Sequence, residues 1–140
     1  MRDEIAAMRR LTDRPFGVNI AQAFVSDPSI VEFVVEQGVQ FVTTSAGDPT
    51  RYTSQLKDAG LTVFHVVPTL RAALKAVEAG VDGLVVEGGE GGGFKNPRDV
   101  ASMVLLPLVC AAVDVPVIAA GGIVDGATMA AAFALGAEGV

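Results

Sequence analysis

The chain has 140 residues, about the length of one domain, and we expect a single partial domain over residues 1–140. Half of the residues (51%) are hydrophobic and 19% are charged, so the chain can bury a sizeable core. Its net charge of −6 argues against nucleic acid or an anionic membrane surface as a partner, and no apolar stretch is long enough to span a bilayer.

Helix start and stop signals recur along the chain after a first, charged helical segment at residues 1–11. An aspartate or threonine opens each predicted helix and a glycine ends it, which are the preferred residues at those positions. The four helices run from Asp27 to Gly38, Asp48 to Gly60, Thr69 to Gly80 and Asp125 to Gly136. Residues 100–113 predict a loop followed by a buried helix, which contains the single cysteine, Cys110, as a core residue.

Short apolar runs between these helices predict strands at residues 16–20, 41–44, 63–67, 84–87 and 115–120. The runs are nearly continuous rather than alternating, which is typical of parallel strands covered on both faces. Residues 138–140 look like the start of a sixth strand. The chain is therefore a βα repeat of roughly twenty residues, with one longer unit.

Two architectures suit such repeats: an open doubly wound sheet and a (β/α)₈ or TIM barrel. A dinucleotide-binding sheet requires G-x-G-x-x-G directly after a strand, and neither that pattern nor a Walker P-loop occurs here. Short, near-equal units favour the barrel, which typically takes about 250 residues. We predict an α/β fold of parallel (β/α) repeats, a partial TIM barrel lacking the first strand and the C-terminal part, whose open edges favour self-association.

The carboxyl ends of the strands in a barrel meet at one mouth, where function concentrates. The sequence places there Asn19, Thr43, Thr44, Ser45, His65, Glu87, the glycine-rich loop 88–93 and Gly121-Gly122. The two glycines follow an apolar strand and precede a helix, so their backbone N–H groups can receive a phosphate. An ordinary βα turn is the alternative interpretation.

Four polar side chains at this mouth have two interpretations each. The Asn19 amide can bond the edge of a heterocycle such as a flavin ring, or make a local turn bond. His65 is the only histidine, and its apolar strand favours a structural role over a base. Glu87 and Glu90 can bond a sugar or ribityl hydroxyl, although solvated charge is preferred for Glu90. With no second histidine and no Cys–His spacing, we expect no metal site.

The motifs together resemble the nitronate monooxygenase / 2-nitropropane dioxygenase family of FMN-dependent barrels, which includes flavin-dependent enoyl reductases. The matching segments are residues 15–20, 63–65, 79–93, 116–123 and 135–140. The resemblance implies that FMN is the cofactor, that Asn19 contacts the flavin, and that Glu87 and Gly92-Gly93 line the ring and ribityl side. It assigns the phosphate to Ala120, Gly121 and Gly122.

The resemblance implies oxidation of alkyl nitronates, or hydride transfer from NAD(P)H through flavin, on a small-molecule substrate. The single cysteine, which can form no disulfide within the chain, fits the reducing cytoplasm. No catalytic residue is assigned. The family usually has a histidine after the last glycines of the long loop, where this chain has Phe94, which cannot transfer a proton. The alternatives are a truncated, non-catalytic barrel segment and another phosphate-binding barrel enzyme.

Overall fold

The computed structural model describes residues 1–93 and 100–140. The strands in these ranges are β1 (Gly17–Ala21), β2 (Phe41–Ser45), β3 (Thr62–Val67), β4 (Gly83–Glu87) and β5 (Val117–Ala120). The α-helices are α1 (Arg2–Leu11), α2 (Ser29–Glu36), α3 (Thr53–Asp58), α4 (Leu70–Glu78), α5 (Ser102–Cys110) and α6 (Gly126–Ala134). Two 3₁₀ turns, η1 (Gln22–Phe24) and η2 (Pro49–Arg51), follow β1 and β2.

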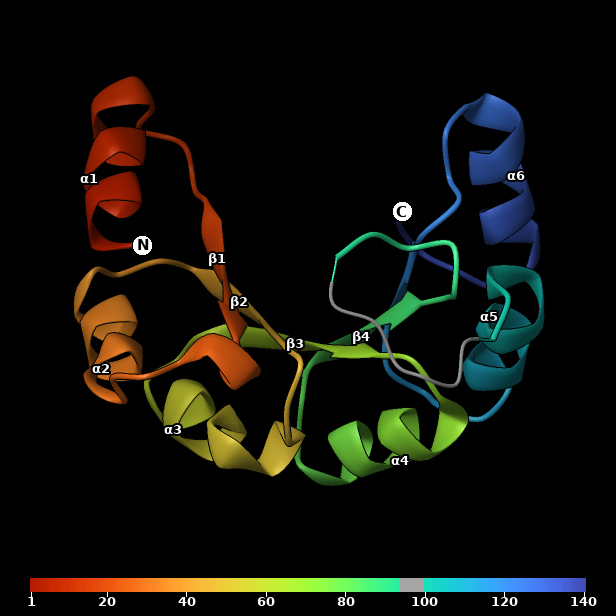
Figure 1. Ribbon diagram of the computed structural model, residues 1–140, viewed down its shortest axis with the longest axis horizontal. Helices are drawn as coiled ribbons and strands as arrows, with labels where there is room; N and C mark the ends of the chain where they lie inside the picture. Colours follow the sequence, from red (N-terminus) through yellow and green to blue (C-terminus); the bar gives the residue numbers. More distant parts are fainter. Residues whose placement is uncertain (94–99) are drawn as a thin grey trace.

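Within the described residues the five strands are all parallel and lie in the order β1-β2-β3-β4-β5. Figure 1 shows the sheet as a curved arc with the helices around its outer side. The predicted α/β fold of parallel repeats, a part of a TIM barrel, is confirmed. A parallel bridge between Ile118 and Gly139 continues the sheet beyond β5, as the sequence predicted for residues 138–140.

The two faces of the sheet differ in burial. Side chains on the helix-covered face, such as Ile20, Val42 and Val63, are fully buried, whereas those on the concave face alternate with them and are half-buried or exposed. The prediction of strands covered on both faces was therefore wrong for the described residues, because the helices cover the outer face alone (Figure 1). This leaves the concave face accessible.

The predicted helix signals are mostly confirmed. The closing glycines Gly38, Gly60, Gly80 and Gly136 all have positive φ, between +62° and +104°. The segment from Asp48 to Gly60 is not one helix, however, but η2 followed by α3. The Asp48 carboxylate accepts from the N–H of Thr50 at 3.0 Å and holds the tight 3₁₀ turn, and the Thr53 hydroxyl donates to the carbonyl of Pro49 at 2.6 Å.

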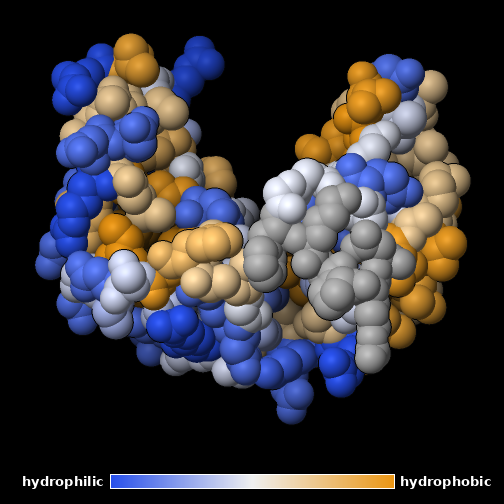
Figure 2. Space-filling model, viewed as in Figure 1, coloured by the Kyte–Doolittle hydropathy of each residue, from blue (hydrophilic) through white to orange (hydrophobic). Residues whose placement is uncertain are grey.

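The space-filling view shows a deep notch between the α1–α2 side and the α5–α6 side (Figure 2). Apolar side chains gather on the α5–α6 side, where Met103, Val104, Met129 and Phe133 are exposed. Among the described helices, none is long and apolar enough to cross a membrane.

Candidate functional site

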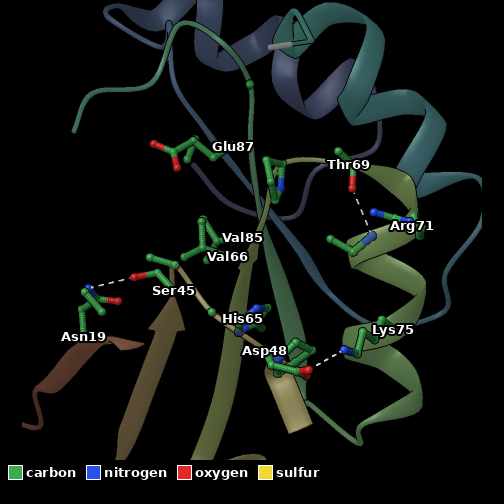
Figure 3. A pocket seen from close by; sticks show the side chains of 18 of the residues that line it. Asn19, Ser45, Asp48, His65, Val66, Thr69, Arg71, Lys75, Val85 and Glu87 are labelled. Atoms are coloured by element: carbon green, nitrogen blue, oxygen red, sulfur yellow. Dashed lines mark hydrogen bonds and ion pairs between the residues drawn. The ribbon is translucent and has the colours of Figure 1, made fainter. Parts of the chain in front are cut away.

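The larger cavity of the described structure, of about 1060 Å³, lies at the carboxyl ends of the strands (Figure 3). Four of the predicted site residues line it: Asn19, Glu87, Gly92 and Ala120. Ser45 and His65 line it as well. The structure thus brings residues from five separate segments to one mouth, as expected for parallel strands.

Asn19 is held at this mouth by β2 (Figure 3). Its Nδ2 donates to Ser45 Oγ at 3.3 Å, and its Oδ1 accepts from Thr43 Oγ1 at 2.9 Å. These bonds go to side chains of the neighbouring strand and not to the local backbone, so the local turn bond is not what the structure shows. The amide has a second N–H and is exposed, which leaves it able to donate to a ligand.

The turn after β2 is constrained from two sides. Ala46 has a φ of +52°, a conformation that is uncommon for any residue except glycine. A Cβ added to Gly47 would lie 2.4 Å from the buried Gln22 Oε1, so only glycine has room there. On the sheet side, the Gly47 backbone acts to raise the pKa of His65. The turn therefore has a fixed backbone conformation where it lines the cavity.

His65 is a structural residue, in agreement with the favoured interpretation. Its ring is buried, and Nδ1 lies 2.7 Å from Thr44 Oγ1 across the β2–β3 pair. Burial lowers the pKa of His65, while the Gly47 backbone and the Asp48 charge act in the opposite direction. A buried, neutral imidazole that is already bonded to Thr44 has a poor position for proton transfer to a ligand.

The glycine-rich loop lies against Glu87. A Cβ added to Gly91 would lie 2.3 Å from Glu87 Oε1, so the loop backbone passes directly over this carboxylate. The loop is tied back to the sheet by the N–H of Gly88, which donates to the Ala120 carbonyl at 3.3 Å. Gly92 and Gly93 face open space, but only Gly92 lines the larger cavity. Phe94 lies outside the described residues.

Glu90 is exposed, as the preferred interpretation has it, but its carboxylate is also hydrogen-bonded. Its carboxylate accepts from the backbone N–H of Ser102 at 3.0 Å and from Ser102 Oγ at 2.8 Å, at the start of α5. Ser102 Oγ also lies 3.2 Å from the Gly121 carbonyl. Glu90 therefore joins the glycine-rich loop to α5 and to the diglycine corner, and stabilises the first turn of α5.

The diglycine corner faces a second, smaller cavity of about 160 Å³ and not the larger one. Gly121 and Gly122 have φ values of +92° and +76°, and a Cβ on Gly121 would lie 2.7 Å from the backbone nitrogen of Gly91. Among the described residues, the N–H groups of Gly121, Gly122 and Ile123 have no hydrogen-bond acceptor. This run of free donors at the end of β5 suits an anion.

The helix after this corner contributes less to an anion site than the sequence suggested. α6 begins at Gly126, and Asp125 and Thr128 form a capping box in which the N–H of Thr128 donates to Asp125 Oδ1 at 2.8 Å. The N–H of Thr128 in the first turn of the helix is thus already used. The corner's own N–H groups are what remains for a phosphate.

The α4 side of the larger cavity was not predicted from the sequence. Thr69, Arg71 and Lys75 line it, together with Asp48 from the turn after β2 (Figure 3). Lys75 Nζ lies 2.5 Å from Asp48 Oδ2, and this contact lowers the pKa of Asp48 to about 2. In the sequence Arg71 and Lys75 look like ordinary surface charges of a helix, and only the fold places them on the cavity.

The comparison with known proteins finds a family match over most of the chain. Residues 21–140 match the sequence profile of the nitronate monooxygenase family. The chain is 40% identical over 136 residues to (3aS,4S,5R,7aS)-5-hydroxy-7a-methyl-1-oxo-octahydro-1H-indene-4-carboxyl-CoA dehydrogenase from Rhodococcus jostii, with 97% of this chain and 38% of that protein covered. It is 34% identical to nitronate monooxygenase from Paraburkholderia phytofirmans, with 86% of this chain and 35% of that protein covered.

Solved structures agree with this match. FabK from Thermotoga maritima superposes with a TM-score of 0.90 at 44% identity, over 99% of this chain and 44% of that chain. In each case the chain spans less than half the length of the relative.

Proposed function

Because this chain belongs to the nitronate monooxygenase family, we propose that it forms the cofactor-binding part of an FMN-dependent oxidoreductase that acts on an acyl thioester. The observation that carries the proposal is the larger cavity, in which Asn19, Glu87 and Gly92 meet. Its volume of about 1060 Å³ has room for a flavin and part of a substrate. Bound FMN supplies hydride-transfer chemistry, which is a property of the cofactor.

The residues present suit a flavin in three respects. The exposed Asn19 amide is fixed in orientation by Thr43 and Ser45, so it can bond a ring edge without first losing side-chain freedom. The glycine-rich loop lets a flat ring approach the backbone. The free N–H groups of Gly121, Gly122 and Ile123 provide a phosphate site beside the cavity.

The preference for a thioester over a nitronate rests on two observations. The relative at 40% identity carries a CoA ester in its name, whereas the nitronate monooxygenase is 34% identical. In addition, residue 94 is phenylalanine, where the family usually has a histidine, and a phenyl ring can neither accept nor donate a proton. Oxidation or reduction of a CoA thioester is therefore favoured over nitronate oxidation.

Titration of the purified protein with FMN tests the cofactor, with binding followed by flavin fluorescence and visible absorption. We expect binding, and Asn19→Ala should weaken it about tenfold because one fixed hydrogen bond is lost. Gln55→Ala, which removes an exposed amide outside the cavity, is the matched control and should bind as the parent does. If FMN does not bind, or if Asn19→Ala leaves its affinity unchanged, the proposed site is wrong.

Anaerobic mixing of the FMN-loaded protein with substrates tests the thioester. A hydroxyacyl-CoA should bleach the visible flavin absorption, whereas an alkyl nitronate should bleach it more slowly or not at all. The opposite order would assign nitronate oxidation instead.

A further inference from the structure

We propose that the α4 side of the larger cavity binds the phosphate groups of an adenine-nucleotide tail, with Arg71 as the cationic contact. Such tails are carried by coenzyme A thioesters and by nicotinamide dinucleotides. The inference rests on the proposed function, because it assigns the far end of a substrate whose reacting end lies near Asn19 and Glu87.

The charges along α4 are the first argument. Arg71 and Lys75 are one helical turn apart and both line the cavity, and two like charges at this spacing repel each other. Lys75 is compensated by Asp48 at 2.5 Å. Among the described residues Arg71 has no acidic partner. In a chain with a net charge of −6, an uncompensated arginine remains on the cavity wall, and an anionic ligand would compensate it.

The position of Arg71 is the second argument. It is the second residue of α4 (Leu70–Glu78), so its charge adds to the positive end of the helix dipole. Thr69 Oγ1 accepts from the N–H of Ala72 at 3.1 Å and fixes the start of the helix. The planar guanidinium of Arg71 can then pair with two phosphate oxygens at once.

The order of polarity across the cavity is the third argument. Figure 3 shows Asn19 and Ser45 on one side, Val66 and Val85 in the middle, and Arg71 on the far side. A coenzyme A thioester and a nicotinamide dinucleotide also carry a reacting group at one end and phosphates farther along the molecule. The order of the cavity wall thus matches the order of the ligand.

The α4 site is separate from the diglycine corner. Gly121 and Gly122 follow β5 and line the smaller cavity, whereas Arg71 follows β3 and lines the larger one. A protein that holds FMN and a nucleotide-tailed substrate together needs two anion sites, and the chain offers one on each side of β4.

Calorimetric titration of the protein with coenzyme A, NADPH and NADH, each with and without FMN, tests this site. Arg71→Gln should weaken the binding of at least one of the three about tenfold, because a charge-assisted contact is lost. Arg71→Lys should recover part of the affinity, since it keeps the charge but not the planar fork. Weaker binding of coenzyme A to Arg71→Gln would assign the site to the tail of a thioester. Weaker binding of NADPH or NADH would assign it to a nicotinamide dinucleotide.

Two controls separate this proposal from the FMN proposal. Arg14→Gln removes an exposed arginine that does not line the cavity and should change no affinity. The FMN affinity of Arg71→Gln should equal that of the parent protein. The inference is overturned if none of the three ligands binds, if Arg71→Gln binds all of them unchanged, or if Arg14→Gln loses as much affinity. If the parent protein does not bind FMN, only the proposed cofactor is wrong, and the α4 site is still tested by the other three ligands.

Discussion

Two polar pairs at the ends of β1, β2 and β3 have opposite surroundings. Asn19 and Thr43 are on the concave face, where the Asn19 amide stays exposed, whereas Thr44 and His65 are on the buried face beneath the helices. Because strand side chains alternate between faces, Thr43 and Thr44 belong to different environments although they are adjacent in sequence. The first pair is available to a ligand, and the second joins β2 to β3.

His65 predicts a pH dependence of stability. Burial lowers its pKa, so the unfolded chain takes up a proton at a pH where the folded chain does not. The free energy of unfolding should therefore be highest above about pH 7 and fall as the pH drops below the ordinary histidine pKa of about 6.5, by at most ~1.4 kcal/mol per pH unit. Urea denaturation between about pH 5 and 8 measures this slope.

The control for this prediction is His65→Gln, which keeps a hydrogen-bonding side chain beside Thr44 but does not titrate. As His65 is the only histidine, the variant should lose the slope in this pH range. The aspartates with lowered pKa, such as Asp48, lose their contribution only at lower pH, as it falls below the ordinary aspartate pKa of about 4. An equal slope in His65→Gln would show that another group is responsible.

At the level of helices and strands, the sequence explains why glycines end the helices. It does not show which side chains pack against those glycines. Gly38 and Gly136 both have positive φ after a helix, at +62° and +104°. An added Cβ at Gly38 meets nothing within 4 Å, whereas at Gly136 it would lie 2.9 Å from the Cβ of Cys110 in α5. The two positions have the same backbone role and differ only in packing.

Alanine at these two positions should therefore cost different amounts of stability. Gly38→Ala introduces only the left-handed strain, of about 1 kcal/mol. Gly136→Ala adds a steric conflict between α6 and α5, which typically costs 1–3 kcal/mol more, for a total of about 2–4 kcal/mol. Chemical denaturation of the two variants measures the difference in their free energies of unfolding. Equal losses of stability would mean that α5 and α6 move apart without a free-energy cost.

At the scale of the whole molecule, the described residues form an open arc. The concave face carries Phe41, which is 44% exposed, and its ring covers Gly17, where an added Cβ would lie 2.2 Å from the ring. The edge of β1 that faces away from β2 has no partner strand among the described residues. An exposed aromatic side chain on the concave face, beside an unpaired strand edge, favours contact with further polypeptide.

We propose that the 140-residue chain purified by itself associates with copies of itself through this face and edge. Sedimentation velocity should show a mass that increases with concentration, and Phe41→Ser should weaken the association. Leu11→Ser removes an exposed apolar side chain at the end of α1 and should leave the association unchanged. A monomer at all concentrations would contradict the proposal.

The repeat period, the helix caps and the closing glycines are local properties of the chain, so the parallel α/β arc could be predicted from the sequence alone. The same periodicity correctly placed Asn19, Glu87 and Gly92 at one mouth, because parallel strands bring their carboxyl ends together. The roles of these residues toward FMN remain predictions.

Only the tertiary structure decided which groups share a cavity and which are already bonded. It separated Gly121 and Gly122 into a smaller cavity, bound Glu90 to Ser102, and brought Arg71 to the wall opposite Asn19. None of these follows from local pattern, because each depends on a contact between segments far apart in the chain. Local sequence determines the backbone conformation, whereas pairing and burial depend on how the repeats pack against one another.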